Sequence, residues 1–230
     1  MLDKDKRVRV IVGHYGSGKS EFAVNYAVQL NKMNKKVMLC DLDIVNPYFR
    51  SRELANELEA DGIKVISSAL GNYTNLDIPM ISAEINRPLV DKTADAVFDL
   101  GGDHVGAKVL VQFYDNIVPE ETDVFFIFNA YREMTQDMKS AYEYMRKIED
   151  SINLKVTGIV NNTHLLHDTT AEDLMYGQRI ALELAERSGV PVRYISGIES
   201  ALRGLPSDIG TETFIINMLM RENWQRREYG

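Results

Sequence analysis

Eight consecutive residues near the N-terminus could hold the phosphates of a nucleotide. They match the pattern Gly-x-x-x-x-Gly-Lys-Ser/Thr in full, with apolar residues typical of a strand before them and apolar residues at helical spacing after them. A phosphate-binding loop requires this order of strand, glycine-rich loop and helix. The loop consists of Gly13, His14, Tyr15, Gly16, Ser17, Gly18, Lys19 and Ser20.

The residue types of this loop indicate its chemistry. Glycines let the backbone wind closely enough for successive N–H groups to point at a phosphate, and the helix that follows favours negative charge at its N-terminus. We expect Lys19 to act in catalysis by bridging the β- and γ-phosphates, and the Ser20 hydroxyl to bind Mg²⁺. All eight residues are therefore expected to contact the nucleotide.

A first acidic motif, Asp41-Leu42-Asp43, follows the second expected strand. One carboxylate of such a pair can support the water shell of the metal while the other orients the attacking water. We expect Asp41 to serve the metal and Asp43 to serve catalysis. An aspartate-rich turn that caps the next helix is the alternative interpretation.

A second acidic motif, Asp99-Leu100-Gly101-Gly102, closes another expected strand. We expect Asp99 to hold Mg²⁺ through a water molecule and the N–H of Gly102 to sense the γ-phosphate. Any strand can end in such a sequence, so this motif alone is weak evidence. It becomes informative because it follows the glycine-rich loop and the Asp41-Leu42-Asp43 motif in the chain.

Two asparagines, Asn161 and Asn162, end a later apolar run. A side-chain amide offers both a donor and an acceptor, which suits N6 and N7 of adenine. The chain has no Asn-Lys-x-Asp sequence whose aspartate would select guanine, so we expect ATP rather than GTP. Both asparagines could instead shape a loop.

Short β-branched and aromatic runs alternate with amphipathic segments along the chain. This alternation predicts an α/β fold with a doubly wound, mostly parallel sheet of seven or eight strands, helices on both faces and a ligand at the carboxyl ends of the strands. After the first strand, which starts at about residue 8, the strand candidates are Lys36–Asp41, Lys64–Ser67, Ala94–Leu100, Asp123–Asn129, Lys155–Asn161 and Pro191–Ile195. Helices are expected at Ser20–Met33, Gln136–Ile148 and Ala171–Arg187, and a further helix or two within residues 68–92.

Composition favours one domain over residues 1–230 that ends in a helix at about 208–227. The first residues lack the apolar core of a signal peptide, so we expect a cytoplasmic protein. The net charge of −8 argues against nonspecific nucleic-acid binding. The last apolar and basic stretch is typical of a membrane-surface helix, but acidic residues dilute its charge, so we expect it to dock on the sheet rather than bind a membrane.

The three ordered motifs resemble the MinD/ParA-like branch of the P-loop nucleotidases, which shares its nucleotide-binding domain with CobQ and CobB. The resemblance implies binding of ATP with Mg²⁺ and, for many members, an ATP-dependent homodimer. It implies that Asp43 positions the attacking water and that Asp99 holds the Walker B position. It further implies that the loop that starts at Asn129 follows a core strand and that residues 158–162 contact adenine.

One departure from this family concerns the second loop residue. The typical members carry a lysine there that reaches the nucleotide of the partner subunit, whereas this chain has His14. A protonated histidine could donate a hydrogen bond to phosphate, but the lysine that acts across the dimer is missing. His164 and His167 could bind a metal, although such a pair beside a loop is more often a surface element.

Three functions remain open at this stage. The first is an ATP-hydrolysing switch that activates, loads or positions a client protein. The second is a small-molecule phosphotransferase or ligase similar to dethiobiotin synthetase or CobB, with Arg50, Lys108 and Arg132 as substrate clamps. The third is a nucleotide-gated interaction protein with little turnover.

Overall fold

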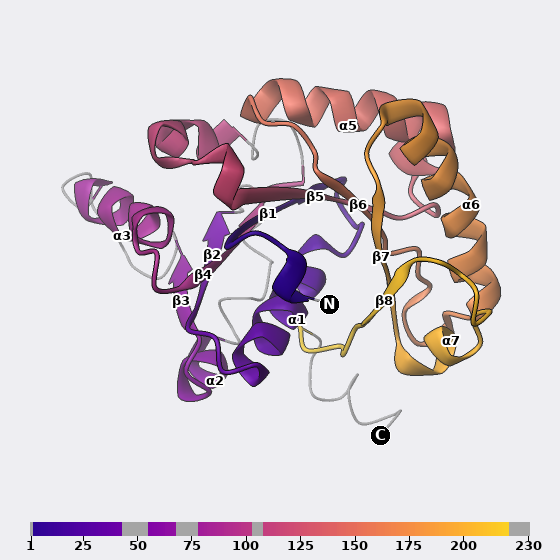
Figure 1. Cartoon of the computed structure of the whole chain (residues 1–230), viewed down its shortest axis with the longest axis horizontal. Coiled ribbons are helices and arrows are strands. Elements are labelled where there is room, and N and C mark those ends of the chain that lie inside the picture. The colour runs from indigo at the N-terminus through magenta and orange to yellow at the C-terminus, as the bar shows by residue number, and fades with distance from the viewer. Residues whose placement is uncertain (1, 43–54, 68–77, 103–107, 221–230) are drawn as a thin grey trace.

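The computed structural model describes residues 2–42, 55–67, 78–102 and 108–220 and contains one eight-stranded sheet (Figure 1). Its strands lie in the order β3-β2-β4-β1-β5-β6-β7-β8, and every pairing is parallel. The predicted doubly wound α/β fold is confirmed. The strands are β1 (Val8–Gly13), β2 (Val37–Leu42), β3 (Lys64–Ser67), β4 (Asp95–Leu100), β5 (Thr122–Phe128), β6 (Gly158–Asn161), β7 (Val192–Gly197) and β8 (Glu212–Ile215).

The helices predicted at 20–33, 136–148 and 171–187 are present near those positions, whereas the two short helices at 55–60 and 199–203 were not predicted. Residues 68–92 were predicted to contain a helix or two, and α3 occupies their described part. The α-helices are α1 (Lys19–Lys32), α2 (Ala55–Ala60), α3 (Ile78–Val90), α5 (Met138–Ile152), α6 (Ala171–Ser188) and α7 (Glu199–Arg203). Short 3-10 helices occupy Leu2–Lys4, Lys108–Asn116, Pro119–Glu121, Glu133–Thr135 and Leu166–Asp168.

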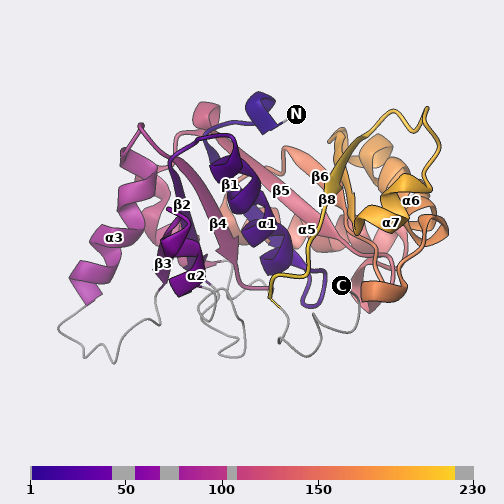
Figure 2. The same ribbon diagram turned by 90° about the horizontal axis from the view of Figure 1, so that it is seen from below.

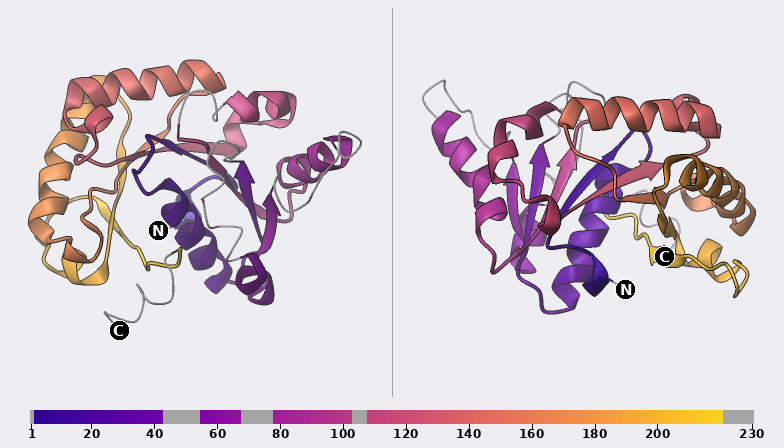
Figure 3. Two further views of the ribbon diagram at one scale, coloured as in Figure 1. Left: turned by 180° about the vertical axis from the view of Figure 1, so that it is seen from behind. Right: turned by 45° about the horizontal axis from the view of Figure 1, so that its top comes forward.

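The central strand β1 sends alternate side chains into two separate cores. Val10 and Val12 face the core under α3, α5 and α6, whereas Ile11 faces the core under α1 and α2. Figures 2 and 3 show α1 and α2 on one face of the sheet and α5 on the other. Because both faces are covered, the inner strands are continuous apolar runs rather than alternating ones.

The strand order changes direction at β1. From there the chain first builds β2, β3 and β4 toward one edge and then β5 to β8 toward the other. A crevice opens at the carboxyl ends of the strands where such a reversal occurs. The glycine-rich loop that follows β1 therefore lies at the expected ligand-binding position.

The predicted C-terminal helix at about 208–227 is wrong in its described part, because residues 212–215 form β8. Phe214 is buried, Ile215 is 41% exposed and Ile216 is buried again, which is the period of a strand. Phe214 packs 4.7 Å from Phe22 of α1, measured between ring centroids. The prediction that this segment is apolar was correct, but the predicted helical periodicity was wrong. None of the described helices has the length and apolarity needed to cross a membrane.

A buried carboxylate, Asp5, ties the N-terminal segment to the amino end of the sheet. It accepts hydrogen bonds from the hydroxyls of Tyr26 and Tyr194 and from the guanidinium of Arg193, and its side chain is fully buried. Burial, more than any other cause, raises the pKa of both tyrosines. Arg9 lies beside this cluster, 5.5 Å from the Tyr26 ring centroid.

We expect Asp5→Ala to lower the free energy of unfolding by about 3 kcal/mol, because the substitution leaves three buried or half-buried donors without their acceptor. Urea titration followed by circular dichroism measures this loss. The matched control is Asp3→Ala, whose exposed carboxylate lies 3.8 Å from Lys35 and which should change stability by less than about 0.5 kcal/mol. Equal stability of the two variants would contradict the anchoring role of Asp5.

Candidate nucleotide-binding site

The glycine-rich loop joins β1 to α1 in a conformation that needs glycine at both of its ends. At Gly13, φ is +151° and an added Cβ would lie 2.3 Å from the carbonyl oxygen of Ile127 on β5. At Gly18, φ is +85° and this residue caps α1 without a side chain. The first N–H groups of α1 are therefore not capped by a side chain of Gly18, as an anion site requires.

The end of β4 touches this loop. Lys19 and Gly102 are both buried, and a Cβ added to Gly102 would lie 2.9 Å from the Lys19 ammonium and 3.0 Å from the backbone nitrogen of Tyr15. The backbone can approach this closely only because residue 102 has no side chain. The structure thus brings together the two motifs from which a γ-phosphate contact was predicted.

The three residues predicted to serve the metal all lie in the described part of the chain. Ser20, Asp41 and Asp99 are all buried, and Asp41 lies opposite Asp99 in the register of β2 and β4. One hydroxyl and two carboxylates fit Mg²⁺, which usually takes one or two carboxylates and completes its shell with water and phosphate oxygens. Asp43 lies outside the described residues, so its catalytic role stays a prediction.

Tyr144 of α5 connects the loop to the end of β4, and the sequence analysis missed it. Its hydroxyl donates a 2.5 Å hydrogen bond to the carbonyl of Gly102, and its ring meets the His14 ring edge-on at 5.1 Å. Burial, with the charges of Lys19 and Arg132, lowers the pKa of His14 below 6.5. This shift disfavours the charged form of the His14 ring.

The two asparagines at the end of β6 have different surroundings. The buried Asn161 amide donates to the carbonyl of Leu174 at 2.9 Å and to Gln178 at 3.3 Å, and its oxygen accepts the N–H of Thr163. These internal bonds turn the Asn161 side chain toward α6 rather than toward the nucleotide. We therefore retain base contact as a prediction only for Asn162.

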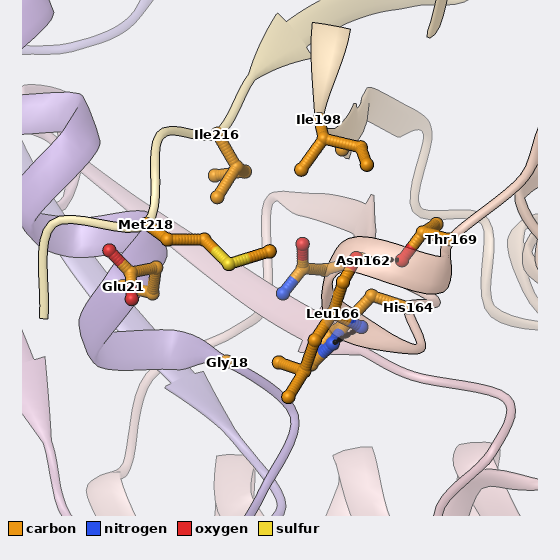
Figure 4. Close-up of a pocket in the computed structure, with 10 residues that line it drawn as sticks. Gly18, Glu21, Asn162, His164, Leu166, Thr169, Ile198, Ile216 and Met218 are labelled. Atoms are coloured by element: carbon orange, nitrogen blue, oxygen red, sulfur yellow. Dashed lines mark hydrogen bonds between the residues drawn. The ribbon is translucent and has the colours of Figure 1, made fainter. Parts of the chain in front are cut away.

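Asn162 joins the glycine-rich loop to two other strands. Its amide nitrogen donates to the carbonyl of Ser17 at 2.7 Å, its amide oxygen accepts from the hydroxyl of Ser196 at 2.8 Å, and its backbone N–H donates to Phe128. The side chain also lines a cavity next to Gly18 (Figure 4).

This cavity has the composition of a base-binding pocket, with apolar walls and a few polar groups. Figure 4 shows Asn162 between Met218, Ile198 and Leu166, with Ile216 beyond them and Glu21 on the α1 side. The sequence analysis named three of the lining residues, Gly18, Asn162 and His164, and of these it expected only Asn162 to contact the base. The lining residues are Gly18, Glu21, Asn162, His164, Leu166, Thr169, Gly197, Ile198, Ile216 and Met218.

One wall of the cavity comes from the segment after β8, which runs beside α1 (Figure 2). Asn25 and the backbone of Asn217 exchange two hydrogen bonds of 2.8 Å, and the Glu21 carboxylate accepts the N–H groups of Leu219 and Met220. These contacts place Ile216 and Met218 at the cavity. The β-branched and aromatic residues around Phe214 were the available sequence signal for this segment.

The remaining candidates are dispersed. His164 lines the base cavity, whereas His167 lines a neighbouring groove, and no group of three or more metal-binding His, Cys, Asp or Glu residues occurs in the described ranges. Arg132 contacts the glycine-rich loop through a 2.8 Å bond to the carbonyl of Gly16. Arg50 lies outside the described residues.

Comparisons with known proteins give the family of the chain and solved structures of similar fold. A model of the CobQ/CobB/MinD/ParA nucleotide binding domain matches residues 10–195. The solved structures of similar fold include the cell division protein FtsY of Thermotoga maritima, with a TM-score of 0.55, 21% identity and coverage of 84% of this chain and 62% of that one. Chloroplast FtsY of Physcomitrella patens gives a TM-score of 0.58 at 17% identity, covering 88% of this chain and 62% of that one.

The 54 kDa signal recognition particle protein of Aeropyrum pernix, in complex with GDP, gives a TM-score of 0.52 at 18% identity, covering 80% of this chain and 40% of that one. At these identities the likeness is one of fold. The chain spans about three fifths of the length of the two FtsY structures above. A comparison with curated protein sequences gave no match.

We expect Gly102→Ala to weaken nucleotide binding about tenfold or more, because the new methyl group occupies the space of the Lys19 ammonium. Isothermal titration calorimetry measures the affinity. The control is Gly189→Ala at the end of α6, where φ is +75° and nothing lies within 4 Å of the added Cβ. That variant should lose stability through backbone strain and keep its affinity. Unchanged affinity in Gly102→Ala would contradict the assigned contact.

Proposed function

Because the chain belongs to the CobQ/CobB/MinD/ParA nucleotide-binding domain family, we propose that it is a Mg²⁺-dependent ATPase that acts as a nucleotide switch. The observation that carries the proposal is the contact between Lys19 of the loop and Gly102 at the end of β4. A γ-phosphate held by Lys19 would lie beside the backbone of Gly102. The presence or loss of that phosphate can therefore shift the backbone of Gly102 at the end of β4.

Each group of residues in the site has a separate role in the proposed reaction. The loop N–H groups and Lys19 bind the phosphates, and Ser20, Asp41 and Asp99 would hold Mg²⁺. The metal, when bound, neutralises charge on the β- and γ-phosphates. Asp43, by the family resemblance, orients the attacking water. With these parts, the products are ADP and phosphate, and intrinsic turnover is expected to be low.

We propose ATP rather than GTP because of the groups at the base cavity. The run Asn161-Asn162-Thr163-His164 has a histidine where an Asn-Lys-x-Asp sequence has its aspartate. His164 Nδ1 accepts the N–H of Leu166 in a long 3.4 Å contact, and we propose that Nε2 of this ring donates to the base. A donor suits the ring nitrogens of adenine and opposes the N–H groups of guanine. The GDP complex of the signal recognition particle protein makes GTP the nucleotide to test against.

A switch also needs a readout by a partner. Tyr144 links Gly102 to His14 and to α5, so a change at the γ-phosphate would reach a helix on the sheet face opposite α1. We propose that this change alters the affinity for a client protein, or for a second copy of the chain, in the course of activation, cofactor loading or positioning.

A small-molecule phosphotransferase or ligase is the second candidate. The histidine at position 14 favours it, because the exchange of lysines across a dimer interface requires a lysine there. A nucleotide-gated interaction protein with little turnover is the third. Substrate-dependent formation of ADP would favour the second function, and tight ATP binding without turnover would favour the third.

The first test compares Lys19→Ala with Asp43→Ala. We expect Lys19→Ala to abolish ATP binding, and Asp43→Ala to keep binding but slow hydrolysis at least about tenfold, a loss of about 1.4 kcal/mol of transition-state stabilisation. Calorimetry measures binding and phosphate release measures turnover, both with Mg²⁺ present. Normal turnover in the Asp43 variant would remove that residue from the mechanism.

The second test concerns the base. We expect Asn162→Ala to reduce the ratio of ATP affinity to GTP affinity, since it removes a polar group from the base cavity. Loss of its bond to Ser17 should weaken both nucleotides alike, so the ratio isolates the base contact. Ser196→Ala, which removes only the hydroxyl bonded to Asn162, is the control and should change the ratio less. An unchanged ratio in Asn162→Ala would move base selection to other residues.

A further inference from the structure

The loop after β5 places a positive charge directly on the glycine-rich loop. Arg132 Nε donates a 2.8 Å hydrogen bond to the carbonyl of Gly16, 116 residues away in the chain. A Cβ added to Gly16 would lie 3.2 Å from Nε and 3.4 Å from Cζ, so the guanidinium packs against the Gly16 backbone. The Arg132 side chain therefore touches the same peptides whose N–H groups are expected to bind phosphate.

The backbone that carries Arg132 is held by a local hydrogen-bond network. Arg132 N–H donates to the carbonyl of Asn129 at 3.1 Å, and the N–H of Thr135 donates to the carbonyl of Arg132 at 2.8 Å. The Thr135 hydroxyl donates to the carbonyl of Asn129 at 2.6 Å, and the Asn129 amide oxygen accepts the N–H of Tyr131 at 2.9 Å. Asn129 and Thr135 are fully buried. This network fixes the arginine before a ligand arrives, which lowers the cost of using it.

The charge of Arg132 is not neutralised within the described part of the chain. The structure shows no ion pair between its guanidinium and a described carboxylate, and its only hydrogen bond within these residues uses Nε. The two terminal nitrogens thus keep four donors that match an anion with several oxygens. The glycine-rich loop itself supplies one lysine, and its second position holds His14 rather than a second lysine.

We propose that Arg132 is a phosphate-contacting residue that acts within its own chain. Its Nε fixes the Gly16 peptide, and its terminal nitrogens bind phosphoryl oxygens of the nucleotide held by the same loop. The cation that typical family members take from a partner subunit is here supplied in cis. This inference rests on the proposed nucleotide site and adds a residue to it.

The binding experiment uses wild type and three variants with a non-hydrolysable ATP analogue, with inorganic tripolyphosphate and with ADP, in calorimetry. Arg132→Ala should weaken the analogue and tripolyphosphate at least about tenfold. Arg132→Lys should restore part of this loss, because an ammonium keeps the charge but cannot bond Gly16 and phosphate together. Arg87→Ala removes an exposed arginine of α3 near the opposite edge of the sheet and should bind like wild type.

The cis experiment measures turnover after mixing Arg132→Ala with Lys19→Ala in equal amounts. An arginine acting across a dimer would rescue the Arg132→Ala subunits in mixed dimers, whereas an arginine acting in cis gives no recovery. Added guanidinium ion should restore part of the turnover of Arg132→Ala and leave Lys19→Ala inactive. A purely structural role for Arg132 would not produce this rescue.

The outcomes separate this inference from the proposed function. Equal affinities in Arg132→Ala and Arg87→Ala would overturn the phosphate contact, and recovery on mixing would overturn its action in cis. A wild type that binds tripolyphosphate but never hydrolyses ATP would refute the ATPase, while the affinity of Arg132→Ala for tripolyphosphate would still decide the role of Arg132. A wild type that binds neither the analogue nor tripolyphosphate would overturn both.

Discussion

The side-chain amide of Asn162 holds together the parts of the site that come from different strands. Its nitrogen bonds to Ser17 in the loop after β1, and its oxygen bonds to Ser196 on β7. An added Cβ at Gly18 would lie 2.4 Å from that nitrogen, so the loop and the amide are in direct packing contact. Because the residue is buried, an unpaired loop carbonyl or hydroxyl there would be costly, and this cost favours one arrangement of loop and strands.

This bridge also explains why the base cavity lies where it does. Asn162 is close to the phosphate loop on one side and to the apolar walls from β7 and the segment after β8 on the other. A nucleotide whose phosphates are bound at the loop would therefore extend past the Asn162 amide into the cavity. The bonds of Glu21 to the backbone of Leu219 and Met220 fix the far wall to α1, the helix that begins at the loop.

The sequence predicted the parts of the fold that depend on local patterns. The buried strands β1, β2 and β4 are mostly apolar, and the loop motif has one structural context, so the doubly wound sheet and the place of Lys19 followed directly. The last strand was missed because apolar residues fill most positions from Phe214 to Met220, which fits a strand as well as a helix, and only the packing of Phe214 and Ile216 beside α1 decides between them. Nothing near Tyr144 in the sequence indicates that it reaches Gly102 across 42 residues.

The roles of Asn161 and Asn162 also could not be distinguished from local sequence patterns. Their residue type made them equal candidates for base contact, but successive residues at a strand end point to opposite faces. Asn161 therefore turns to α6, where Gln178 and Leu174 take its hydrogen bonds, and Asn162 turns to the loop. Such a division depends on which face each helix covers, and the positions of α1 and α6 on opposite faces of the sheet determine it.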